Sequence, residues 1–124
     1  MIVVDTDILI WLLRGNQDIA DKFIDLAENT NGNIFITPIQ IAEICAGIRK
    51  NEEEDTEIFF RRCQIINIDF NIGKQAGIYM SLYKKSHNVT IADSLIAATA
   101  KMKSFKIWTL NKKHYPMFSI EEFI

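Results

Sequence analysis

Three carboxylates stand alone in stretches whose other residues are typical of a protein interior. Asp5 ends the first apolar run of the chain. Glu43 is the only charged residue in 34–48, and Asp93 is the only charged residue in 88–100. An unpaired carboxylate in apolar surroundings is costly, so each needs a compensating partner. No base close by in sequence supplies one, which indicates that the three acids share a cation.

A divalent metal ion is the cation that such residues favour. In a parallel α/β fold, the carboxyl ends of the strands and the starts of the next helices meet at one crevice. We expect Asp5 and Asp93 at that edge, with Glu43, in the second turn of its helix, near enough to join them. Carboxylate oxygens without Cys or His suit a hard ion, Mg²⁺ or Mn²⁺, rather than zinc.

Ordinary structural roles are open for the same acids. Asp93 lies three residues after Thr90 and could complete a capping box at a helix start. Asp5 could cap the helix that follows it. Glu43 could face an edge where its carboxylate reaches solvent. For Asp7 we favour an exposed turn residue over a second-rank metal ligand.

Short β-branched runs alternate with helical periodicity along the chain. The patterns predict strands over 2–4, 34–36, 65–68 and 106–110, and helices over 8–14, 18–29, 38–50, 52–62, 70–86 and 91–103. Thr37-Pro38 with Gln40 is a strong helix start, and Asp69 suits the cap of the helix after it. The alternation predicts one domain over residues 1–124, an α/β/α sandwich with a central, mainly parallel sheet.

Composition excludes several classes of protein. The 124 residues are 48% hydrophobic and 24% charged, which excludes a disordered or collagen-like chain. The longest apolar run, 8–13, is far shorter than the roughly 20 residues that cross a bilayer. Asp5 and Asp7 interrupt the N-terminus where a secretory signal needs an apolar core. Cys45 and Cys63 are interpreted as free thiols, so we expect a cytoplasmic protein. Trp11 and Phe23 are expected in the core.

Taken alone, the net charge of −2 disfavours a nucleic-acid enzyme, since such proteins usually carry an excess of basic residues. The charge is unevenly distributed, however. Residues 1–62 are acidic on balance and residues 63–124 are basic, with no carboxylate at all in 94–120. The overall figure therefore does not exclude RNA as a substrate.

Four segments together resemble a known family. They are Asp5-Thr6-Asp7-Ile8-Leu9-Ile10, then Ile41-Ala42-Glu43 with Gly47, then 91–100, and finally 109–115. In this order they resemble the PIN-domain ribonucleases, and most of all the VapC-type toxins of bacterial and archaeal toxin–antitoxin modules. The resemblance runs through nearly the whole chain.

The resemblance implies a metal-dependent endoribonuclease in which Asp5, Glu43 and Asp93 hold Mg²⁺ or Mn²⁺. Family members often place a fourth acid where this chain has Asn111, and an acid where it has His114. Asn111 can still offer a carbonyl oxygen or orient a bound water. With three carboxylates we expect one firmly held ion and a second recruited with RNA.

The resemblance also implies partners. Lys112, Lys113 and His114 would meet the RNA backbone beside the acidic pocket. The protein would form a homodimer, and a small antitoxin would inactivate it by filling the active-site groove with its tail. The sequence does not indicate which RNA is cut.

Two other functions are compatible with parts of the sequence. Asp5-Thr6-Asp7 after an apolar strand also resembles the haloacid-dehalogenase-type phosphatases, and Asp69 follows a strand as a receiver's phosphoacceptor does. The missing fourth acid keeps open a non-catalytic PIN-like module that binds RNA or a partner without cutting.

Overall fold

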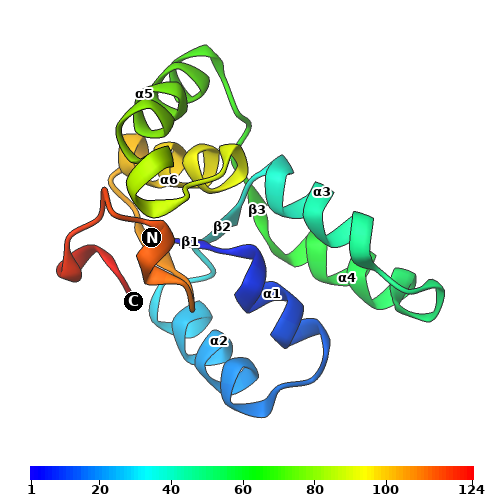
Figure 1. The fold of residues 1–124 in the computed structure, drawn as a ribbon. Coiled ribbons are helices and arrows are strands. Elements are labelled where there is room, and N and C mark those ends of the chain that lie inside the picture. The colour runs from blue at the N-terminus through cyan, green and yellow to red at the C-terminus, as the bar shows by residue number, and fades with distance from the viewer.

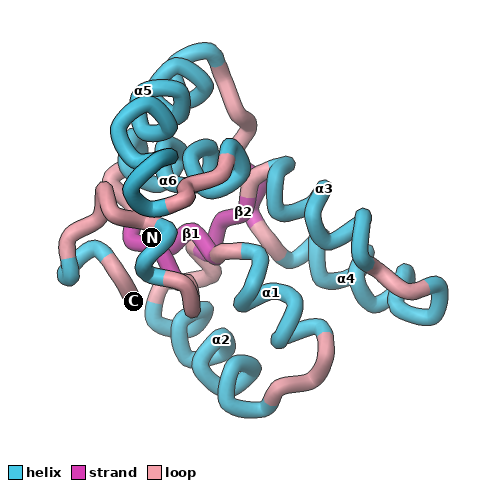
Figure 2. The backbone as a smooth tube through the Cα atoms, in the orientation of Figure 1, coloured by secondary structure: helices cyan, strands magenta, loops and turns pink.

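A four-stranded parallel sheet forms the centre of the computed structural model, which describes residues 1–124. Its strands are β1 (Ile2–Val4), β2 (Ile34–Ile36), β3 (Gln64–Ile65) and β4 (Lys106–Trp108), in the spatial order β3-β2-β1-β4. Helices lie on both sides of the sheet (Figure 2). The predicted α/β/α sandwich is therefore confirmed, with a sheet that is wholly parallel.

Six α-helices surround the sheet: α1 (Thr6–Leu13), α2 (Gln17–Asn29), α3 (Pro38–Gly47), α4 (Glu53–Arg62), α5 (Phe70–His87) and α6 (Ile91–Lys103). Three 3₁₀ turns complete the chain: η1 (Lys50–Glu52), η2 (Lys112–His114) and η3 (Ile120–Glu122). Helices α5 and α6 pack together, while α1 lies beside both α2 and α3 (Figure 1). No helix has the length and apolar character needed to cross a membrane.

The strands divide their side chains between two hydrophobic cores. Ile2 and Val4 of β1 contact the core that includes Ile8 and Ile44, from α1 and α3. Val3 points the other way and contacts the core that includes Ile96 of α6. This division follows from the two-residue period of a strand, because successive side chains point to opposite faces of the sheet.

The predicted start of α3 is confirmed and ties this helix to the sheet. The Thr37 hydroxyl accepts from the Ile39 N–H at 3.1 Å, and Gln40 Oε1 accepts from the Thr37 N–H at 2.9 Å. Gln40 is fully buried, and its Nε2 donates to the Val4 carbonyl at 3.0 Å. Gln40 thereby fixes the position of α3 against the carboxyl end of β1.

Several predicted boundaries were wrong, each for a local reason. Helix α1 begins at Thr6, two residues earlier than expected, because Asp5 caps it. Helix α3 ends at Gly47, and a separate 3₁₀ turn follows instead of helix up to Lys50. The last strand stops at Trp108, since the next residues bond to the acids of the site.

Two further sequence interpretations differ from the structure. The predicted strand 65–68 is only Gln64–Ile65, after which the chain turns towards the Asp69 cap of α5. Trp11, expected in the core, is 47% exposed on α1. Both cysteines are free thiols as predicted, and burial raises the pKa of Cys63 to about 11.

Candidate active site

The carboxyl edge of the sheet brings together segments that lie far apart in the sequence. Asp5 directly follows strand β1, and its N–H donates to the Trp108 carbonyl at the end of the neighbouring β4 at 2.9 Å. The loop after β4 and the start of α1 therefore meet at this edge. Figure 1 shows the N-terminal ends of α1 and α6 approaching the same region of the fold.

Asp5 is the most buried acid at this edge, with 7% of its surface exposed. Its Oδ1 accepts from the Thr6 N–H at 2.8 Å, and its Oδ2 accepts from the Thr109 hydroxyl at 2.7 Å. Burial, helped by the charge of Asp7, raises the pKa of Asp5 to about 6. These two hydrogen bonds and the nearby Tyr115 hydroxyl favour the charged form, but they do not offset the loss of solvent.

Asp7 is not the exposed turn residue that we favoured. It is half-buried in the first turn of α1, and its Oδ1 accepts from the Ile8 N–H at 2.7 Å. Its Oδ2 accepts from the Leu110 N–H at 3.0 Å and from Thr109 Oγ1 and Asn111 Nδ2 at 3.4 Å each. Burial raises its pKa. Asp7 thus holds the loop after β4 against α1.

Glu43 joins the site through Thr6. The Thr6 hydroxyl donates to Glu43 Oε1 at 2.8 Å, while the Thr6 N–H donates to Asp5. Glu43 does not lie in apolar surroundings as expected, because Ala42 and Cys45 beside it on α3 are also exposed. The solvent-facing alternative is therefore correct for Glu43, yet its carboxylate is held beside Asp5.

Asp93 has the capping role considered for it. The Thr90 hydroxyl accepts from the Asp93 N–H at 3.1 Å, and Asp93 Oδ2 accepts from the Thr90 N–H at 3.4 Å. His114 Nδ1 lies 3.6 Å from the same Oδ2. The other oxygen, Oδ1, accepts no hydrogen bond, and the charge of Asp93 is near enough to contribute to the raised pKa of Asp7.

In the polar segment after β4, some residues contact the acids and others only face solvent. Asn111 is exposed, and its amide reaches Asp7 while its N–H donates to Thr109 Oγ1 at 3.0 Å. Lys112 and Lys113 are both exposed in η2. The Lys112 ammonium lies over the Phe123 ring, 5.3 Å from its centroid. Of the predicted RNA contacts, the structure brings only His114 into contact with one of the acids.

His114 is the only basic side chain that pairs with an acid of this site. No Lys or Arg pairs with any of these acids: the ion pairs are Arg49–Glu52, Arg61–Glu57, Lys101–Glu122 and His114–Asp93. As the side chains stand, no three Asp, Glu, His or Cys groups are close enough together to surround a metal ion. The Thr109 hydroxyl donates to both Asp5 and Asp7, and the Thr6 hydroxyl donates to Glu43. These carboxylate oxygens, with those of Asp93, fit a hard divalent cation by their oxygen chemistry.

Three residues of the site were not singled out from the sequence. Thr6 and Thr109 carry the hydroxyls that orient the acids, and Tyr115 is a buried residue near Asp5. Thr109 directly follows the buried end of β4, as Asp5 follows β1, and this shared position at the ends of two strands was the available signal.

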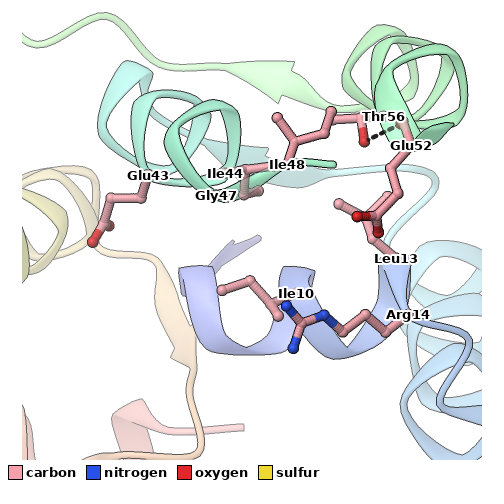
Figure 3. A pocket seen from close by; sticks show the side chains of 9 residues that line it. All are labelled: Ile10, Leu13, Arg14, Glu43, Ile44, Gly47, Ile48, Glu52 and Thr56. Atoms are coloured by element: carbon pink, nitrogen blue, oxygen red, sulfur yellow. Dashed lines mark hydrogen bonds between the residues drawn. The ribbon is translucent and has the colours of Figure 1, made fainter. Parts of the chain in front are cut away.

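A groove leads away from Glu43 between α1 and α3. Its volume is about 80 Å³, and it is lined by Ile10, Leu13, Arg14, Glu43, Ile44, Gly47, Ile48, Glu52 and Thr56. Figure 3 shows Glu43 at one end of this groove and Arg14 with Glu52 at the other, with aliphatic side chains between them. The groove therefore combines an apolar floor with a charged residue at each end.

Comparison with known proteins identifies the class of this fold and site. The family model described as the PIN domain matches residues 2–116, so the chain belongs to the PIN-domain family. Ribonuclease VapC10 of Mycobacterium tuberculosis is 34% identical over 119 residues, covering 95% of this chain and 88% of that protein. Ribonuclease VapC19 of the same organism is 31% identical, covering 95% of this chain and 94% of that protein. Within the family, the chain is of the VapC type.

Solved structures agree with this fold. The crystal structure of VapBC2 from Rickettsia felis bound to a promoter DNA fragment gives a TM-score of 0.81 at 23% identity, covering 100% of this chain and 96% of that one. A toxin–antitoxin complex from Klebsiella pneumoniae gives 0.79 at 23% identity with the same coverage. The receiver alternative has no support at Asp69, whose side chain caps α5 by accepting from the Ile72 N–H at 2.9 Å.

Proposed function

We propose that this protein is a divalent-metal-dependent endoribonuclease and the toxin of a toxin–antitoxin pair. The observation that carries the proposal is the gathering of four carboxylates, none paired with Lys or Arg, at the carboxyl edge of the sheet. The VapC ribonucleases to which the chain is similar supply the class of reaction.

In the proposed site, Asp5, Glu43 and Asp93 hold Mg²⁺ or Mn²⁺. Such an ion lowers the pKa of a bound water and stabilises charge on the scissile phosphate. The chain's own residues prepare the site: Thr109 and the Thr6 N–H orient Asp5, and the Thr6 hydroxyl orients Glu43.

Two polar residues beside the acids complete the proposed catalytic machinery. Asn111 stands where the resemblance to the PIN-domain ribonucleases leads us to expect an acid, and its amide is already directed at Asp7. We propose that it orients a water or a phosphate oxygen rather than binding the ion strongly, because an amide carries no charge. His114, 3.6 Å from Asp93, can donate to an RNA phosphate when it is protonated.

RNA binding is proposed for the positively charged surface beside the acids. Lys113 is exposed in η2, and Lys112 lies over Phe123 with its ammonium free to contact a phosphate. Phosphate contacts of this kind supply affinity without sequence preference. They leave the choice of RNA to other parts of the surface.

An antitoxin and a second copy of the chain are the proposed protein partners. The groove between α1 and α3 ends at Glu43, so a tail with aliphatic side chains and a terminal basic residue would fill it and block the site. For the homodimer, α5 offers Phe70, Ile78 and Leu82, which are 80%, 47% and 62% exposed. Phe59 and Phe60, by contrast, pack against a core.

A non-catalytic binding module is the second candidate. It is favoured by the exposed Asn111 in place of an acid and by the separation of the carboxylates, no three of which stand close enough to surround an ion. Such a module would bind RNA or a partner through the same surface without cutting.

Cleavage of a mixed RNA pool by the purified, partner-free protein separates these functions. We expect cleavage with Mg²⁺ or Mn²⁺, none with EDTA, and none with Asp5→Asn. Asp69→Asn, which alters only the exposed cap of α5, is the matched control and should cut normally. Cleavage that survives both EDTA and Asp5→Asn would exclude the metal site. RNA binding without cleavage by folded, metal-loaded protein would establish the binding module.

A further inference from the structure

The hydroxyl of Tyr115 is a buried polar group without a hydrogen-bond partner. Tyr115 is 1% exposed and belongs to the core formed with Val3 and Ile96, where its ring meets Phe118 edge-on at 6.0 Å. A buried tyrosine hydroxyl usually finds a partner, because leaving it unpaired costs about 1–3 kcal/mol. A phenylalanine would fill the same space without that cost.

This hydroxyl lies close to the acids of the site. Burial raises the pKa of Tyr115 well above its ordinary value, and the charges of Asp5, Asp93 and Asp7 add to the rise, in that order. Asp5 is thus its most influential charged neighbour, and the two groups are near enough for a hydrogen-bond contribution to the pKa of each, although the hydroxyl makes no bond of full hydrogen-bond geometry.

We propose that Tyr115 is a positioning residue for the cation site: its hydroxyl donates to the Asp5 carboxylate when a divalent cation is bound. The inference rests on the proposed metal-dependent function. Asp5 already accepts from the Thr6 N–H on one oxygen and from Thr109 on the other. Each carboxylate oxygen has a second lone pair, so Tyr115 can add a third donor without displacing either bond. Three donors fix the direction of the oxygens that face the ion.

Tyr115→Phe tests the proposal because it keeps the ring and removes one oxygen. Manganese binding, followed by electron paramagnetic resonance without RNA, is the readout. Loss of a group that supports a metal ligand typically weakens metal affinity by about 10–100-fold, and we expect at least the lower figure. The melting temperature of the metal-free protein should stay the same or rise, because the unpaired hydroxyl is gone.

A matched control and a second background make the result specific. Tyr83→Phe removes the same atom from α5, where the ring meets His87 away from the acids, and should leave Mn²⁺ affinity unchanged. In an Asp5→Asn background, Tyr115→Phe should weaken Mn²⁺ binding no further, since the hydroxyl acts through Asp5.

The possible failures are distinguishable. If the wild-type protein binds no Mn²⁺, the proposed function fails and this inference with it. If the wild-type protein binds Mn²⁺ and Tyr115→Phe binds it equally well, only the role of Tyr115 is refuted. A lower melting temperature of metal-free Tyr115→Phe would also refute it, because the hydroxyl would then have a partner in the fold itself.

Discussion

Asp5 should destabilise the metal-free protein at neutral pH, and replacing it with asparagine should relieve that cost. The pKa of Asp5 is about 6 in the fold against an ordinary value of 3.8. The folded protein therefore binds the proton more tightly than the unfolded chain does. Between these two values stability must fall as pH rises, since the native state has to release a proton that it holds more strongly.

The two pKa values correspond to about 3 kcal/mol, at 1.36 kcal/mol for each pH unit of difference. At pH 4 the Asp5 carboxyl is mostly protonated in the fold, so wild type and Asp5→Asn should differ little. By pH 7.5 the variant should gain up to about 3 kcal/mol relative to the wild-type protein. The asparagine carbonyl can still accept one of the two bonds from Thr6 and Thr109.

Urea unfolding in EDTA at several values from pH 4 to pH 8 measures this effect. The difference between the two stability curves isolates Asp5 from the other acids, which titrate in both proteins. Added Mg²⁺ should make the wild-type protein more stable than Asp5→Asn, because the ion stabilises only the protein that can bind it. If Asp5→Asn is less stable than wild type at pH 7.5 in EDTA, the burial cost assigned to Asp5 is wrong.

Three other substitutions give separate tests. Gln40→Met should cost about 1–3 kcal/mol of unfolding free energy by leaving the buried Val4 carbonyl unpaired, and an unchanged urea midpoint would contradict this. Lys113→Gln should weaken RNA binding about equally for all sequences and reduce the salt dependence by about one counterion; a change of preferred sequence would refute a pure phosphate contact. Leu82→Glu on α5 should shift the protein from dimer to monomer in analytical ultracentrifugation, whereas an intact dimer would place the interface elsewhere.

The acids of the site were predictable from the sequence because a lone charge in an apolar stretch is a strong signal. That signal identified Asp5, Glu43 and Asp93, but it did not predict how exposed each carboxylate is to solvent. Glu43 is exposed, since its neighbours on α3 are small residues that face solvent and not a core. The role of Asp7 in holding the loop after β4 was not predicted, because it depends on Leu110, a partner about a hundred positions away in the sequence.

The hydroxyl groups of the site could not be predicted in the same way. Thr109 directly follows a buried strand, where threonine is a common residue, and Tyr115 follows the polar turn η2. Their importance depends on which way the oxygen points, and only the packing of β4 beside β1 determines that. Trp11 shows the converse, since helical periodicity predicted a core residue that the fold leaves exposed.

Helix capping and cation binding are compatible at this site because they use different atoms of the same side chains. Asp93 caps α6 with Oδ2 and leaves Oδ1 without a hydrogen bond. Asp5 caps α1 with Oδ1 and directs Oδ2 to Thr109. A cap fixes the rotation of the side chain, so each helix start holds its carboxylate in place before any ion arrives. A divalent ion would then turn the formal net charge of −2 to about zero, which is why an acidic chain can still attract RNA.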